Sequence, residues 1–175
     1  MNHNGWLNSE KEINIIYIYG IYHILTIITL YFCTKLFLMK IARQISIVLL
    51  AVTAASAIYA SYHFILDPTG QTIGYSLADI KGSPFKDYLI PGWLMLIFLG
   101  LGSVVSCGLT MQEDESYTNY IMGQGAICML WVLVQIIMLQ RLTFIQIAFV
   151  IVGTALFFSG KRISKQMDKY QQASS

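Results

Sequence analysis

Residues 116–140 read SYTNYIMGQGAICMLWVLVQIIMLQ, a run of 25 residues without a charged side chain. A helix rises about 1.5 Å per residue, so about 20 residues cross the roughly 30 Å hydrocarbon core of a membrane. Four more uncharged windows of 19 to 25 residues lie at 13–34, 44–66, 88–112 and 142–160. We therefore expect an all-α transmembrane helical bundle with four core spans and an N-terminal fifth, at 13–34, 44–66, 85–112, 117–140 and 142–160.

The composition of the whole chain supports this assignment and excludes several classes of function. Charged residues make up 11% of the 175 residues and hydrophobic residues 56%, whereas a soluble domain carries about 25% charged residues. The net charge is +2, and no dense basic patch outside the tail points to nucleic acid. The longest connection, residues 67–87, is too short for a separate catalytic domain. A single integral membrane domain is predicted for residues 1–175.

The first window, residues 13–34, has the features of a retained helix and not those of a secretory signal. A signal needs a basic start, an apolar stretch of about 7 to 15 residues and small residues at a cleavage site. Here Glu10 and Glu12 precede a longer window, and Tyr31 and Cys33 stand near its end. We expect this helix to span the membrane, and a helix lying flat at the interface is the alternative.

The distribution of basic residues predicts the orientation. With five spans and the N-terminus outside, seven Lys and Arg lie on one side and four on the other. The more basic side is usually cytoplasmic, which places the C-terminus in the cytoplasm. Residues 161–170 carry Lys161, Lys165 and Lys169 on one helical face and Ile163 on the opposite one, and this basic amphipathic tail suits anionic lipid headgroups. An ordinary cytoplasmic flank is the alternative interpretation.

The connection between the second and third spans carries strong turn signals. Asp67-Pro68 followed by Gly70 is expected to end the second span. Ser83-Pro84 predicts a helix start, because serine caps a helix and proline fits its first position. Pro91-Gly92 would then lie about two turns into the third span, where a kink is expected.

Polar residues inside the spans must find partners within the bundle, because hydrocarbon offers none. Gln124, Cys128, Trp131 and Gln135 follow steps of four, three and four residues, which places them on one inward face of the fourth span. This face either holds helices together through hydrogen bonds, which we favour, or lines a cleft for a ligand. The candidate cleft residues are His63, Asp67, Pro91, Gln124, Trp131 and Gln135.

No catalytic residue, metal site or cofactor is predicted. His63 and Asp67 are four residues apart where the second span leaves the membrane. They could relay a proton, although a hydrogen-bonded helix end is the more common use of such a pair. The cysteines form no CxxC pair, and we interpret them as small buried hydrophobes. The acidic run Glu113 to Glu115 lacks the ligand pattern of a calcium loop.

Small residues recur at intervals of four in the second and third spans, which allows helices to approach closely. These two spans are therefore the favoured tight pair. The residues predicted to pack are Ala51, Ala55, Ala57, Ser61, Gly102 and Ser106.

Residues 82–92 read GSPFKDYLIPG, and residues 131–135 read WVLVQ. With these motifs, residues 44–160 resemble a loose group of uncharacterised bacterial four-span membrane proteins. The resemblance implies a four-span fold and a bacterial inner membrane, and it implies no activity. The first window and the acidic Glu113 to Glu115 connection are departures from the group.

Two hypotheses of function follow. The leading one is a small non-catalytic membrane protein that packs with copies of itself or with a membrane partner. The alternative is a carrier or a lipid-binding or small-molecule-binding protein, with a cleft that opens outward near Pro91. The absence of a nucleophile, base or cofactor pattern favours a non-enzymatic role. The expected partners are the lipid bilayer and a second copy or another membrane protein, with no nucleic acid.

Overall fold

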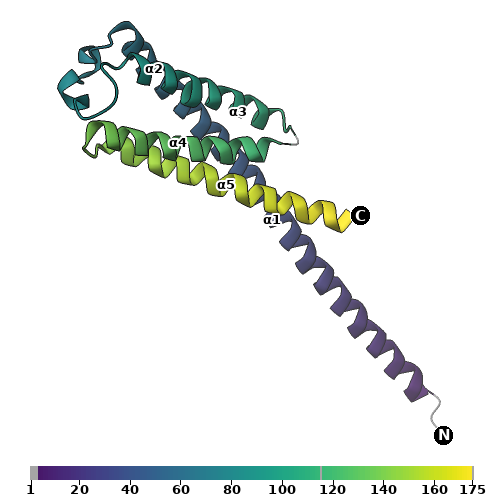
Figure 1. The fold of residues 1–175 in the computed structure, drawn as a ribbon. Helices are drawn as coiled ribbons and strands as arrows, with labels where there is room; N and C mark the ends of the chain where they lie inside the picture. Colours follow the sequence, from purple (N-terminus) through teal and green to yellow (C-terminus); the bar gives the residue numbers. More distant parts are fainter. Residues whose placement is uncertain (1–3, 115, 175) are drawn as a thin grey trace. The chain divides into compact units, whose positions relative to one another are not determined.

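The computed structural model describes residues 4–114 and 116–174, and all regular elements of this part are helical (Figure 1). Four stretches of it are long and apolar enough to cross a membrane: Phe37–Leu66, Leu89–Met111, Tyr117–Leu139 and Phe144–Lys169. The expected fold class, an all-α bundle of membrane-spanning helices, is confirmed. The chain divides into two compact units between Ile41 and Ala42. The contacts that build the candidate site lie within the second unit.

Five α-helices, two short 3₁₀ helices and one π-helix follow one another along the described chain. The α-helices are α1 (Asn4–Leu66), α2 (Leu89–Met95), α3 (Gly102–Met111), α4 (Tyr117–Leu139) and α5 (Phe144–Ser174). The 3₁₀ helices η1 (Gln71–Ile73) and η2 (Leu77–Ile80) lie in the connection after α1. The π-helix η3 (Leu96–Leu101) joins α2 to α3, so that the three form one span.

Two helix boundaries differ from the sequence-based expectation. Residues 35–43, expected to connect two spans, belong to α1, and they contain no proline or glycine that would end a helix. Side chains of most of the expected first span, 13–34, lie outside the described residues, so that span stays a prediction. The third span begins at Leu89 and not at residue 85.

The expected kink at Pro91 is wrong. Pro91 is the third residue of α2, where a backbone N–H has no partner within the helix and its absence costs little. The irregularity of this span lies further on, in the π-helix η3.

Helices α4 and α5 run antiparallel and side by side (Figure 1). Glycines allow their backbones to touch. A Cβ atom added at Gly125 would lie 2.6 Å from the carbonyl oxygen of Gly153, and one added at Gly160 would lie 2.9 Å from that of Thr118. Among the glycines whose surroundings are described, those between α4 and α5 make the closest approach to a neighbouring backbone. From the sequence we expected the closest pair of helices to be the second and third spans.

The π-helix is held by a side chain from α4. Gln124 is buried, and its Nε2 donates to the carbonyl oxygen of Phe98 at 3.0 Å and to Oγ of Ser103 at 2.9 Å. Its Oε1 occupies the space beside Gly102, where a Cβ atom would lie 2.8 Å away. Gln124 thus holds α4 against η3 and α3, the structural role that the sequence favoured for the amides of this span.

The second half of α1 contacts the remaining spans at several levels. Gly92 lies against Phe64, and Gly100 lies against Ile58. At the other end of this segment, Ser46 shares a hydrogen bond with Ser159 of α5 at 2.9 Å, and Arg43 forms an ion pair with Glu113. The exposed Glu113 thus pairs the connection after α3 with α1.

Candidate apolar binding pocket

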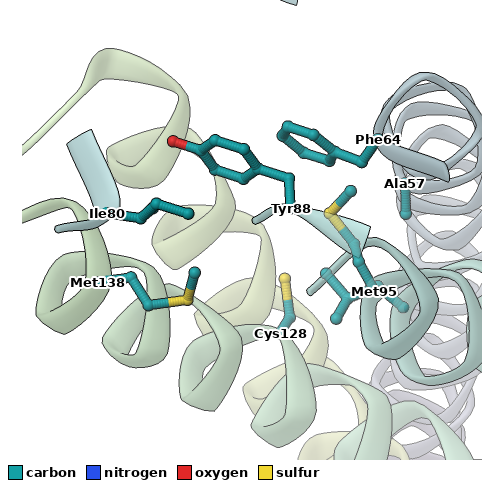
Figure 2. Packing of buried hydrophobic residues seen from close by; sticks show 8 residues of the cluster. Ala57, Phe64, Ile80, Tyr88, Met95, Cys128 and Met138 are labelled. Carbon is teal, nitrogen blue, oxygen red and sulfur yellow. The ribbon is translucent and has the colours of Figure 1, made fainter. Parts of the chain in front are cut away.

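A cluster of buried side chains gathers where α1, α2 and α4 meet the connection of residues 67–88. Figure 2 shows Phe64 of α1, Tyr88 of the connection, Met95 of α2 and Met138 of α4 in one cluster, with the ring of Phe64 beside that of Tyr88. The rings of Phe64 and Tyr88 stack with centroids 4.8 Å apart. This aromatic pair joins the connection of residues 67–88 to the end of α1.

A pocket of about 870 Å³ lies beside this cluster, lined by α1, η1, α2, η3, α4, α5 and the tyrosines of the connection. This volume is in the range of known ligand sites, about 300 to 1,000 Å³. None of the lining side chains is charged, and most are aliphatic or aromatic. The pocket therefore suits the apolar part of a ligand and disfavours an ion, whose desolvation would be uncompensated.

The lining residues of the pocket that are exposed all lie on α1 and α5, which indicates a mouth between these two helices. Farther from the connection of residues 67–88, Ser46 of α1 and Ser159 of α5 share a hydrogen bond. At the level of the pocket, Tyr59 of α1 and Ile145 and Ala148 of α5 are lining residues that are also exposed. Both helices contain a stretch that is long and apolar enough to cross a membrane.

The connection of residues 67–88 closes one end of the pocket with Tyr75 and Tyr88. The hydroxyl of Tyr88 donates to the carbonyl oxygen of Ser76 at 3.1 Å. Burial, followed by the nearby Asp79 carboxylate, raises the pKa of Tyr88 to about 12, so the hydroxyl stays neutral and continues to donate. Asp79 pairs with Arg141 at 3.5 Å, which fixes the connection to the turn between α4 and α5.

Asp67 organises the first turn of this connection. Its carboxylate oxygens accept hydrogen bonds from the hydroxyls and amides of Thr69 and Thr72, at 2.5 to 3.1 Å. These bonds hold the pKa of Asp67 well below its usual value of 3.8. His63 is engaged separately, with Nδ1 2.9 Å from the carbonyl oxygen of Tyr59. The two side chains thus have different partners and form no hydrogen bond with each other in the described chain.

The structure places the six candidate cleft residues in two groups. Pro91, Trp131 and Gln135 line the pocket. Three others are not among its lining residues: His63, Asp67 and Gln124.

The residues predicted to pack between helices differ in burial. Ala57 and Ser61 are buried on the inner side of α1, whereas Ala51 and Ala55 are exposed. Ala55 and Ala57 line the pocket. Ser106 is buried, and its carbonyl oxygen accepts a hydrogen bond from the hydroxyl of Thr110 at 2.6 Å. Gly102 contacts Gln124 of α4, as described above.

Sequence reasoning missed most of the pocket wall. Phe64, Met95, Leu99 and Met138 are ordinary hydrophobic residues within spans, and nothing in their spacing separates a pocket wall from a packed core. Tyr88 carried a weak signal, as an aromatic residue in a connection that is otherwise rich in turn residues.

Within the described residues, no group of three or more His, Cys, Asp or Glu side chains is arranged to hold a metal ion. Comparisons with known protein families, with curated proteins and with solved structures find no match to this chain. The resemblance to bacterial four-span proteins therefore stays a prediction.

Proposed function

We propose that this membrane protein binds the apolar chain of a lipid or lipid-like molecule in the pocket between α1 and α5. The observation that carries the proposal is the uncharged pocket of about 870 Å³ with exposed lining residues on two membrane-spanning helices. A chain can pass from the bilayer into such a pocket without crossing water, so its hydrophobic surface remains covered throughout.

The connection of residues 67–88 supports the proposal because its tyrosines form one end of the pocket. Tyr75 and Tyr88 separate the pocket from the polar segment of residues 67–72. Tyr88 is in turn held by Ser76 and Phe64. A chain that enters between α1 and α5 would end against these rings.

The orientation is proposed from the basic residues. The connection of residues 67–88 lies outside a bacterial inner membrane, and the C-terminus lies in the cytoplasm. The ion pair between Asp79 and Arg141 supports a common side for this connection and for the turn after α4. Self-packing or packing with a membrane partner, the leading hypothesis from the sequence, stays a prediction.

Ala148→Phe tests the proposal by filling the mouth. Ala148 is exposed and lines the pocket from α5, so a phenyl ring there should obstruct an entering chain. In vesicles that contain a phospholipid with a diazirine in its acyl chain, photolysis of the unaltered protein should label the pocket-lining Trp131, Met138 and Phe149 as well as exposed residues such as Ile137 and Ile151. We expect Ala148→Phe to reduce the labelling of the three pocket residues by about tenfold, the equivalent of about 1.4 kcal/mol, and to leave that of the exposed residues unchanged.

Ala155→Phe is the matched control. Ala155 is exposed and lies two helical turns beyond Ala148 on nearly the same face of α5, outside the pocket. It should leave the labelling of the three pocket residues unchanged. Equal labelling of these residues in both variants, or labelling of the exposed residues alone, would contradict the proposal.

A further inference from the structure

Several hydrogen-bonding side chains line the pocket, and some of them are hydrogen-bonded within the described chain whereas Tyr59, Tyr75, Trp131 and Gln135 are not. The hydroxyls of Thr53 and Ser56 donate to carbonyl oxygens of their own helix, at 2.8 Å each. Tyr88 donates to Ser76. The amide of Gln135 lines the pocket and forms no hydrogen bond to any other residue of the described chain. An amide inside a membrane span is costly without a partner.

A second hydrogen-bond donor without an acceptor lies on the same face of α4. The indole N–H of Trp131 is buried and has no acceptor within the part of the chain that the structure describes. Trp131 precedes Gln135 by four residues, and both line the pocket. Gln135 lies four residues before the end of α4 at Leu139, or about 6 Å along the helix axis. The lining residues of α4 extend from Trp131 to Leu139, so Gln135 lies in the middle of this wall and Trp131 at its far end, about 12 Å from the end of α4.

On the basis of the function proposed above, we infer that the ligand is a neutral lipid whose hydroxyl or carbonyl head binds the amide of Gln135. A glutamine amide offers a donor and an acceptor, which matches a hydroxyl or a carbonyl. The lining carries no Lys, Arg, His, Asp or Glu, so a charged head in the pocket would lose its hydration without gaining a counterion. A phospholipid could place only a chain there, with its headgroup left outside.

The test uses three probes with the same brominated chain: dibromo-octadecanol, ionised dibromostearate and dibromo-octadecane. Bromine quenches tryptophan fluorescence at short range. The full-length chain with Trp6→Phe and Trp93→Phe retains Trp131 as its single tryptophan and is placed in phosphatidylcholine vesicles. At about pH 9, where the carboxyl group is ionised, we expect the alcohol to reach half-quenching at a membrane concentration about tenfold below that of the carboxylate.

With Gln135 in place, the alcohol should also quench at a lower concentration than dibromo-octadecane, because only the alcohol can bind the amide. Gln135→Leu should leave the alcohol no better than dibromo-octadecane, whereas the carboxylate stays disfavoured by the uncharged lining. Gln112→Leu is the matched control, since Gln112 is an exposed glutamine after α3 and lies outside the pocket. It should keep the advantage of the alcohol over dibromo-octadecane.

The outcomes separate the two proposals. If dibromo-octadecane quenches Trp131 but the alcohol and the carboxylate act alike, or if Gln135→Leu leaves the alcohol better than dibromo-octadecane, the inference about the head is overturned while chain binding stands. If none of the three probes quenches Trp131, the proposed function fails with it.

Discussion

Gly125→Ala is expected to destabilise the protein by at least about 3 kcal/mol, the upper end of the usual cost of overpacking. The new methyl group would lie 2.6 Å from the carbonyl oxygen of Gly153 and 2.7 Å from the backbone nitrogen of Phe157. Both contacts are with backbone atoms, which cannot move aside as a flexible side chain can. Relief therefore requires α4 and α5 to separate along their shared face, and unfolding of the purified protein in detergent measures the loss.

Gly123→Ala is the control in the same helix. Nothing lies within 4 Å of a Cβ atom at Gly123, so the substitution meets open space. Replacing a helical glycine by alanine then stabilises by about 0.5 to 1 kcal/mol. Similar losses in the two variants would mean that α4 and α5 do not pack through Gly125.

Gly70→Ala is expected to loosen the closed end of the pocket. Gly70 has φ +77, a conformation that costs a residue with a side chain about 1 to 2 kcal/mol. A Cβ atom there would also lie 2.9 Å from Cβ of Tyr75 and 3.0 Å from the ring of Tyr88. Backbone amides of residues 69–88 should therefore exchange with solvent at least about tenfold faster, as measured by hydrogen–deuterium exchange.

Gly74→Ala separates the two causes. Gly74 has φ +80, and nothing lies within 4 Å of its Cβ position. This variant has the backbone strain without the collision. We expect a smaller acceleration of exchange and unchanged labelling of the pocket by the diazirine lipid, whereas Gly70→Ala should reduce that labelling. Equal effects of both variants would show that the two tyrosines do not form the end of the pocket.

The membrane-spanning helices could be predicted from the sequence because the cost of burying charge leaves a local signal. The uncharged windows at 117–140 and 142–160 coincide with α4 and the first part of α5. The start of α2 was harder to predict. Ser83-Pro84 is a favourable helix start, but the helix begins at Leu89, and Tyr88 before it packs against Phe64.

Helix pairing and the pocket could not be predicted in the same way. Glycines and alanines occur in every core span, and spacing alone does not reveal that Gly125 faces Gly153. The inward face of α4 was recognised from Gln124, Trp131 and Gln135. On this face, Gln124 holds helices together, whereas Trp131 and Gln135 line the pocket. This difference depends on how the other helices pack around α4, which the sequence of α4 alone does not reveal.

The central claim, that lipid chains enter the pocket, is tested most directly by comparing two tryptophans in bilayers made of dibrominated phosphatidylcholine. Trp93 is exposed on α2 and reports the lipid around the protein, whereas Trp131 lines the pocket and lies eight residues, or about 12 Å, from the end of α4. In chains that retain only one of them, Trp131 should be quenched as strongly as Trp93, and Ala148→Phe should protect Trp131 alone. Fluorescence of Trp131 that stays unquenched while Trp93 is quenched would contradict the account.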